Sequence, residues 1–195
     1  MRERVVFIDF ETTGLDARSG EKIVEIGAFK IDERGKKFSF HSLVNPQRDI
    51  SFSARGIHNI SEEMLKMAPT MEEILPLFLN FIEEGYICGY NLDFDLSFLE
   101  GYVERYFFTE HRFIDVLAMS RYCFRDFEKF SLGNVCRRLN IEYPLQHRAL
   151  QDAIATSKVF FRCWEVMKNR GMTGDVKTLA EKFGPDIVRK YENSF

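Results

Sequence analysis

The chain has 195 residues, of which 45% are hydrophobic and 29% charged, and its formal net charge is −3. This length and composition are typical of one well-buried globular domain, with room for a small appendage, and there is no low-complexity tract. The slightly negative charge argues against a generally basic protein that coats nucleic acid, but it leaves local contact with nucleic acid open.

The first 84 residues predict a strand meander followed by a helix. The segment "RVVFIDF" (4–10) is apolar on both faces, which is typical of a central strand covered on both sides. "KIVEIGAFKI" and "KKFSFHSLV" predict two more strands, joined by a hairpin turn at "DERG". Apolar residues at helical spacing predict a helix over 70–84, with Thr70 as N-cap, Glu73 completing a capping box and Pro76 inside it.

The rest of the domain alternates short strands with helices. "YICGY" (86–90) and "FIDV" (113–116) predict strands. Helices are expected over four stretches: 93–107, 116–123, 131–139 and about Ala149 to Lys168. A meander followed by alternating helices and strands predicts an α/β domain with a mixed sheet.

The last thirty residues have a different pattern. "DVKTLAEKF" and "PDIVRKYE" predict two short helices separated by Gly184 and Pro185. We therefore expect one domain over residues 1–168 and a helical tail over 169–195, which either packs on the domain or docks a partner.

The cysteines and the apolar runs bear on the cellular compartment. The four cysteines are widely spaced without a C-x-x-C pair, which favours buried, reduced thiols. No apolar run approaches the roughly 18 residues of a membrane span, and the first run meets Asp9 too early for a signal peptide. A cytoplasmic protein without a membrane partner is expected.

Two carboxylates, Asp9 and Glu11, interrupt the first predicted strand. Within a strand their side chains would lie on the same side, with Cα atoms roughly 7 Å apart. Near a low-dielectric interior they would repel each other, and desolvation would raise the pKa of both. A divalent cation would reverse that unfavourable charge balance. Alternatively, both residues lie beyond the end of the strand in solvent or in a turn, and this segment alone does not decide between the two interpretations.

Two further stretches carry residues of the same chemistry. "YNLDFDLSFL" places Asp93 and Asp95 at a helix start, and "QHRALQDAIA" places His147 just before the long helix with Asp152 in about its first turn. Each stretch alone is more typical of ordinary helix starts. Together with Asp9 and Glu11 they meet the requirements of a two-metal hydrolytic site, where hard oxygen ligands favour Mg²⁺ or Mn²⁺.

These segments together resemble the DEDDh (DnaQ-like) family of 3′–5′ exonucleases. The family motifs F-x-D-x-E-T-T-G-L, N-x3-D-x2-F-L and H-x-A-x2-D-A correspond to "FIDFETTGL", "NLDFDLSFL" and "HRALQDA", in the family's order. "IHNISEEML" and "FIDVLAMSR" are similar to two further family segments, although Asn59 replaces a usual Gly and Val116 a frequent Thr. Asn tolerates a left-handed backbone, so Asn59 need not disturb its loop.

The resemblance covers roughly residues 3–165 and is strongest to the proofreading exonuclease of bacterial DNA polymerase III, including the type built into the polymerase chain. It implies a ribonuclease H-like fold, with a central mixed β-sheet flanked by helices and a short helical C-terminal extension. It also implies metal-dependent 3′–5′ hydrolysis of single-stranded DNA, or of frayed 3′ primer ends, to nucleoside 5′-monophosphates. Replication proofreading or repair would be its setting, and a DNA polymerase subunit its partner.

The family's site residues carry over onto matching positions. Asp9, Glu11, Asp95 and Asp152 would bind two divalent ions, Mg²⁺ or Mn²⁺, and His147 would act as the general base, a role that suits an imidazole at neutral pH. The resemblance also implies contacts with the substrate strand, which are made by Thr12, Thr13, Gly14, Leu15, His58, Asn91 and Phe94. Core packing is the alternative for Leu15 and Phe94.

Two alternative functions remain open at this point. An RNA-preferring DEDDh exoribonuclease would share the chemistry. The run "DFETTGL" favours DNA, because the oligoribonuclease branch usually has Met in place of the first Thr, although several RNA-processing members also carry both threonines. A non-catalytic polymerase accessory module is the other alternative, but such modules typically lose metal ligands, and all four carboxylates and His147 are present.

Overall fold

A computed structural model of the protein describes residues 3–172 and 174–192. Its strands are β1 (Val5–Thr12), β2 (Ile23–Ile31), β3 (Lys37–Leu43), β4 (Tyr86–Gly89) and β5 (Arg112–Asp115). Its helices are a 3₁₀ turn (Ala17–Ser19), α1 (Phe52–His58), α2 (Glu62–Leu65), α3 (Met71–Ile82), α4 (Leu92–Leu99), α5 (Tyr106–Glu110), α6 (Val116–Cys123), α7 (Leu132–Arg138), α8 (Ala149–Asn169), α9 (Val176–Phe183) and α10 (Asp186–Glu192).

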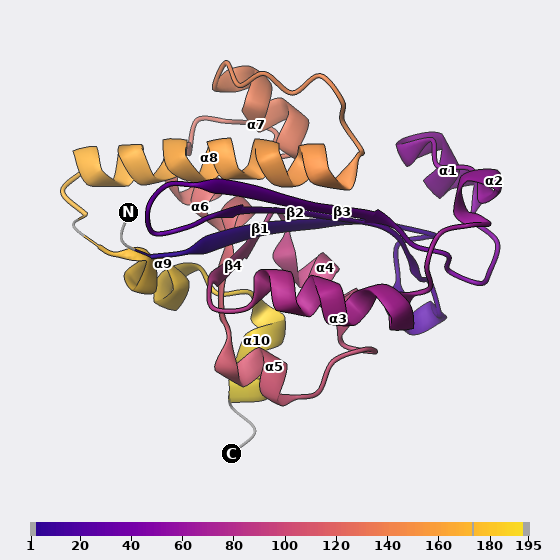
Figure 1. Ribbon diagram of the computed structural model, residues 1–195. Helices are drawn as coiled ribbons and strands as arrows, with labels where there is room; N and C mark the ends of the chain where they lie inside the picture. The colour runs from indigo at the N-terminus through magenta and orange to yellow at the C-terminus, as the bar shows by residue number, and fades with distance from the viewer. Residues whose placement is uncertain (1–2, 173, 193–195) are drawn as a thin grey trace.

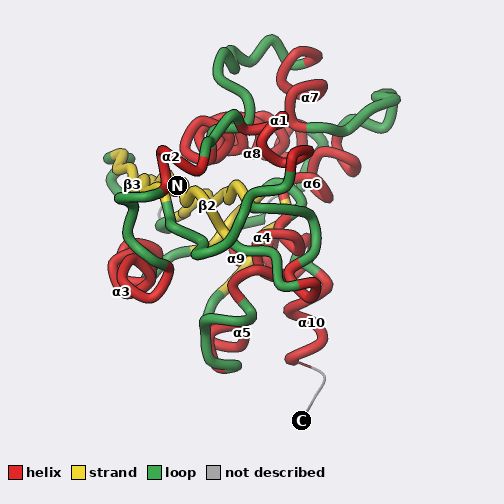
Figure 2. The backbone as a smooth tube through the Cα atoms, turned by 90° about the vertical axis from the view of Figure 1, so that its right-hand side faces the viewer, coloured by secondary structure: helices red, strands yellow, loops and turns green. Residues whose placement is uncertain are grey.

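The strands form one mixed sheet between two layers of helices (Figure 1). The strand order is β3-β2-β1-β4-β5, in which β1, β2 and β3 pair antiparallel, whereas β4 pairs parallel with both β1 and β5. Helices α6, α7 and α8 cover one face, and α3 and α4 cover the other (Figures 1 and 2). The predicted mixed sheet flanked by helices is confirmed.

The strand β1 is central because its side chains are apolar on both faces. Val5 and Phe7 belong to the core shared with α6 and α8, whereas Val6 and Ile8 belong to the core shared with α3 and α4. This alternation continues to the end of the strand. It places the two carboxylates that follow Phe7 on the face covered by α8.

Several local predictions are confirmed, and one is wrong. Thr70 and Glu73 form the capping box of α3, and Asn59 ends α1 with a left-handed φ of 57°. The single helix predicted over 93–107 is instead two helices, because α4 ends at Leu99 and α5 begins only at Tyr106. Gly101 lies in the turn between them, and glycine is a weak helix former.

The C-terminal helices pack on the domain in the described part of the tail. Helix α9 lies against β5, and α10 lies against α4 and α5 (Figures 1 and 2). Asp93 accepts hydrogen bonds from the backbone N–H groups of Asp186 (3.1 Å) and Ile187 (2.7 Å), so it caps the start of α10. The Tyr191 ring stacks on Phe108 with centroids 4.6 Å apart. The domain boundary at residue 168 stays a prediction.

Gly27 of β2 lets the start of α8 rest directly on the sheet. A Cβ atom at this position would lie 2.1 Å from the carbonyl carbon of Ala149 and 2.2 Å from the backbone nitrogen of Leu150. Any side chain would therefore push α8 away from the strand. The absence of a side chain sets the position of the helix that carries Asp152.

We expect Gly27→Ala to lower the free energy of unfolding by about 3 kcal/mol, because backbone atoms cannot yield as a side chain would. Gly56→Ala is the matched control, since a Cβ atom there meets nothing within 4 Å and Gly56 lies inside α1. That change should leave stability equal or slightly higher. Urea denaturation measures both, and equal midpoints for the two variants would show that α8 does not rest on Gly27.

Candidate active site

Asp9 and Glu11 both lie within β1, near its C-terminal end. This position rules out the alternative in which the pair follows the strand. In the β1–β2 register Asp9 lies opposite Gly27 and Glu11 opposite Glu25, and the register shifts just after Glu11. Glu11 is buried and Asp9 is partly buried. The strand therefore fixes two carboxylates on the face that α8 covers.

Asp95 joins this pair from α4, the helix that follows the neighbouring parallel strand β4. Helix α4 begins directly after β4, and the carboxyl ends of β1 and β4 meet at the same edge of the sheet. The buried Asp95 carboxylate accepts a 2.9 Å hydrogen bond from the backbone N–H of Phe10, between the two β1 carboxylates. Of the two candidate aspartates in this stretch, Asp95 faces the site, whereas Asp93 caps α10.

The loop before α8 and the first turn of α8 bring the remaining groups. Glu11, His147 and Asp152 each offer a ligand atom within 4.8 Å of the other two. Asp152 is buried in the first turn of the helix and accepts a 2.6 Å hydrogen bond from the hydroxyl of Tyr143. His147 is exposed, and its backbone has a left-handed φ of 61°. The imidazole can therefore reach both the carboxylates and solvent.

Burial raises the pKa of every carboxylate in the cluster, and neighbouring carboxylates add to this rise at Asp9, Glu11 and Asp95. Desolvation is the main cause, and it raises the pKa of Glu11 to about 8 and that of Asp152 to about 6, with neighbouring carboxylates adding to the shift of Glu11. The pKa values of Asp9 and Asp95 are raised well above the ordinary range, again chiefly by desolvation. Such a concentration of oxygen ligands and unrelieved negative charge suits a hard divalent cation.

We expect the metal-free protein to lose stability as the pH rises from 5 to 8.5. A raised carboxyl pKa means that the folded state keeps protons which the unfolded chain releases near pH 4. Unfolding then releases protons, so the free energy of unfolding falls as the pH rises through the folded pKa values. Thermal melting in EDTA measures this trend. A melting temperature that is constant or rising over this range would contradict the repulsion.

Three residues of this region were not among the sequence candidates. Tyr143 holds Asp152, and Arg148 donates to Glu25 from Nη2 at 2.6 Å and from Nε at 3.1 Å. Glu25 is fully buried and lies opposite Glu11. The segment "VEIG" has the pattern of an ordinary strand. The one signal in the sequence that could have identified Glu25 is that a charged residue stands within an apolar run, where burial is expected.

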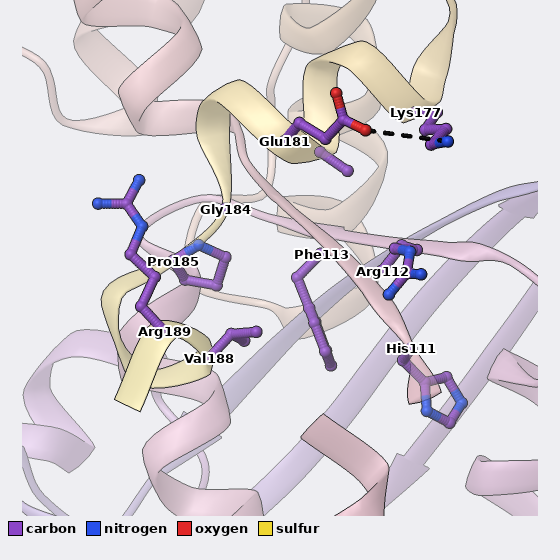
Figure 3. Close-up of a pocket in the computed structure, with 10 residues that line it drawn as sticks. His111, Arg112, Phe113, Lys177, Glu181, Gly184, Pro185, Val188 and Arg189 are labelled. Carbon is purple, nitrogen blue, oxygen red and sulfur yellow. Dashed lines mark ion pairs between the residues drawn. The ribbon is translucent and has the colours of Figure 1, made fainter. Parts of the chain in front are cut away.

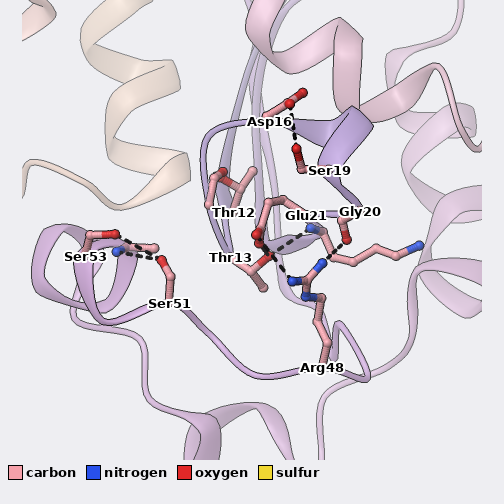
Figure 4. Close-up of polar contacts among 12 residues, drawn as sticks. Thr12, Thr13, Asp16, Ser19, Gly20, Glu21, Arg48, Ser51 and Ser53 are labelled. Atoms are coloured by element: carbon pink, nitrogen blue, oxygen red, sulfur yellow. Dashed lines mark hydrogen bonds and ion pairs between the residues drawn. The ribbon is translucent and has the colours of Figure 1, made fainter.

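Among the candidate substrate residues, Thr12 ends β1, and Thr13, Gly14 and Leu15 lie in the loop that follows it. Figure 4 shows the polar contacts around Thr12 and Thr13. The Thr12 hydroxyl donates to the carbonyl of Gly14 at 2.6 Å. The Thr13 hydroxyl donates to Glu21, and the carbonyl of Thr13 accepts a 3.2 Å bond from the N–H of Ser51. This network joins the loop to the start of α1 and holds its backbone at the open edge of the site.

Leu15, His58, Asn91 and Phe94 have different environments. The Leu15 side chain is 82% exposed, so it takes no part in the core, whereas Phe94 is partly buried with its ring 5.0 Å from that of Phe98. Asn91 is exposed at the start of α4, with a left-handed φ of 65°. The alternative role in core packing is therefore correct in part for Phe94 and wrong for Leu15.

His58 keeps an unused hydrogen-bond donor. Its ring is 3% exposed, and Nδ1 accepts a 3.0 Å bond from the N–H of Ile60, which leaves the proton of the neutral ring on Nε2. Burial lowers the pKa of His58, so the ring stays neutral. Nε2 has no partner among the described residues. A buried donor without a protein partner is rare in folded proteins, and a water or a ligand commonly supplies the partner.

A cavity elsewhere on the described surface involves none of these residues. It has a volume of about 380 Å³ and lies between β5 and the helices α9 and α10, with Arg112, Lys177 and Arg189 among its lining residues (Figure 3).

Within the described helices, none combines the length and apolar character needed to cross a membrane.

Comparison with known proteins shows to which family the chain is similar. The Exonuclease family model (RNase_T) matches residues 6–160. The chain is 39% identical over 170 residues to the PolC-type DNA polymerase III of Thermotoga petrophila, which covers 86% of this chain and 12% of that polymerase. It is 37% identical over 168 residues to the DNA polymerase III subunit epsilon of Rickettsia prowazekii, which covers 80% of this chain and 72% of that subunit.

A solved structure shares the fold as well. Exonuclease X, in complex with 5′ overhanging duplex DNA, matches with a TM-score of 0.68 and 25% identity, over 91% of this chain and 98% of that one. This chain therefore belongs to the DEDDh (DnaQ-like) exonuclease family, alongside the matched PolC-type and epsilon chains of DNA polymerase III.

Proposed function

We propose that this protein is a metal-dependent 3′–5′ exonuclease that hydrolyses single-stranded DNA or frayed 3′ primer ends and releases nucleoside 5′-monophosphates. The observation that carries this proposal is the cluster of Glu11, Asp152 and the exposed His147, with Asp9 and the buried Asp95 close by at the carboxyl edge of β1 and β4. The relatives named DNA polymerase III favour DNA as the substrate and a DNA polymerase as the partner.

Four side chains would hold the cofactor, which we propose to be two ions of Mg²⁺ or Mn²⁺. They are Asp9, Glu11, Asp95 and Asp152. When bound there, the cations supply positive charge that neutralises these carboxylates and the phosphodiester. Their oxygen donors and raised pKa values fit such ions, because the ions would keep all four groups ionised.

His147 would take the proton of the attacking water. It is exposed, and it lies within 4.8 Å of Glu11 and Asp152 as measured between ligand atoms. An imidazole at neutral pH is suited to this transfer, and a loop position lets the ring adjust as substrate enters.

The loop after β1 and the ring of His58 would hold the 3′-terminal nucleotide. Leu15 is exposed and free to wedge against the terminal base, and the unused Nε2–H of His58 can donate to a sugar or phosphate oxygen. Phe94 and Asn91 would border the path of the strand. These contacts involve backbone and sugar as much as base, so little sequence preference is expected.

A time course on 5′-labelled single-stranded DNA and on matched RNA, with Mn²⁺ or with EDTA, tests the proposal. The expected result is a ladder that shortens from the 3′ end only with metal, and faster on DNA. Equal or faster degradation of RNA would favour the exoribonuclease alternative. Intact strands under every metal condition would leave the accessory-module alternative.

A further inference from the structure

Glu25 is a fifth carboxylate next to the proposed metal ligands, and its environment differs from theirs. Its side chain is 0% exposed and lies on the same face of the sheet as Glu11, its partner in the β1–β2 register. A buried carboxylate beside other negative charges is strongly unfavourable unless its charge is paired and its oxygens accept hydrogen bonds. Desolvation alone would raise the pKa of Glu25, but hydrogen bonds from Arg148, His41 and Ala149 lower it.

Both oxygens of Glu25 are occupied by donors. Oε1 accepts from Nη2 of Arg148 at 2.6 Å and faces Nε2 of His41 at 2.7 Å. Oε2 accepts from the backbone N–H of Ala149 at 2.9 Å and from Nε of Arg148 at 3.3 Å. With its charge paired and its oxygens engaged, Glu25 is not available as a metal ligand, although it lies beside the cluster.

These hydrogen bonds to Glu25 fix the positions of Arg148 and Ala149, the two residues that follow His147. Arg148 is the next residue, and Ala149 begins α8 against Gly27. His147 itself has a left-handed φ of 61°, a backbone region that is uncommon for residues other than glycine. The hydrogen bonds to Glu25 restrain this part of the backbone from β2.

We propose that Glu25 and Arg148 form a clamp that positions His147 over Glu11 and Asp152. The clamp is a positioning device: neither residue contacts the reacting atoms, and both act through the loop that carries the imidazole. This inference rests on the proposed function, since it assumes that His147 is the base. It predicts that breaking the clamp lowers kcat by about 30-fold, within the range of 10 to 100 measured for residues that orient catalytic groups.

A double-mutant cycle separates this role from a general structural one. Arg148→Met should lower kcat by about 30-fold when His147 is present, and by less than about 3-fold in the His147→Ala background, because the two residues act as a unit. KM and the affinity for Mn²⁺ should stay within about 2-fold. Arg162→Met is the control on the same helix, since Arg162 is exposed and its ion pair within the described part of the chain is a local one with Glu165. Equal losses in both backgrounds would overturn the proposal.

Hydrogen exchange gives a readout that does not depend on activity. In Arg148→Met, the amide of Ala149 should exchange at least about tenfold faster, while amides in the middle of β1 keep their protection. The double variant Glu25→Gln with Arg148→Met leaves no unpaired buried charge, so it should remain folded and show the same faster exchange. Unchanged exchange in both variants would overturn the clamp. If the wild type degraded neither DNA nor RNA, the proposed function would fail while the exchange experiment still decided the clamp.

Discussion

Asp9→Asn is expected to lower the turnover of single-stranded DNA by at least about a thousandfold and, in EDTA, to raise the melting temperature. The loss of activity follows because Asp9 lies close enough to Asp95, Asp152 and Glu11 for their charges to raise its pKa beyond the effect of burial, and losing its share of charge stabilisation costs several kcal/mol of barrier. The gain in stability follows because Asn at this position carries neither a buried, repelled charge nor the cost of taking up a proton on folding, and it keeps the shape of the side chain.

The two effects should separate when metal is added. Millimolar Mg²⁺ should raise the melting temperature of the wild type by mass action and raise that of Asp9→Asn much less. Asp126→Asn is the matched control, because Asp126 is exposed and, among residues 3–172 and 174–192, forms an ion pair with Arg138 alone, at 3.7 Å. An Asp9→Asn variant that melts lower than the wild type in EDTA, or that keeps its activity, would contradict the proposed metal site.

His147→Ala is expected to lower kcat by about 10²- to 10⁴-fold, the usual contribution of a positioned general base. Metal binding should survive, because the four carboxylates remain. Stability should change little, since the side chain is exposed. His147→Asn is a second variant that tolerates the left-handed backbone at this position. Steady-state kinetics and the rise of melting temperature with Mg²⁺ measure the two properties.

Gln146→Ala is the control for the loop, because Gln146 is the preceding exposed residue. It should keep activity within about twofold, as surface changes usually do. If both His147 variants turned over DNA at the wild-type rate, another group would have to accept the proton of the water, and His147 would not be the base.

The fold could be predicted from the sequence where the pattern reports burial directly. The alternation of β1 and the apolar spacing of α3 and α8 each show which side of an element is covered, so these elements were predicted close to their observed ends. The helix predicted over 93–107 failed because apolar residues continue past Gly101 although the chain turns there. Helices α1 and α2 were missed because they are short and mostly exposed.

The site could be predicted only in part, because sequence motifs mark residue types but not the contacts between them. The segment "LDFD" alone does not show which aspartate belongs to the site. Asp95 accepts a hydrogen bond from the N–H of Phe10, whereas Asp93 caps α10, and this difference depends on where the C-terminal helices pack. Glu25 and Arg148 are 123 residues apart in sequence and meet only because α8 rests on Gly27.

Calorimetric titration of Mn²⁺ into the metal-free protein at pH 8 tests the central claim most directly. We predict saturable binding of two ions per chain by the wild type, weakened by at least about tenfold in Asp9→Asn and unchanged in Asp126→Asn. Loss of a residue that merely hydrogen-bonds to a metal ligand typically weakens metal binding by about tenfold or more, so loss of a direct ligand should weaken it at least as much. Absence of binding by the wild type, or equal binding by Asp9→Asn, would contradict the claim that these carboxylates form a metal site.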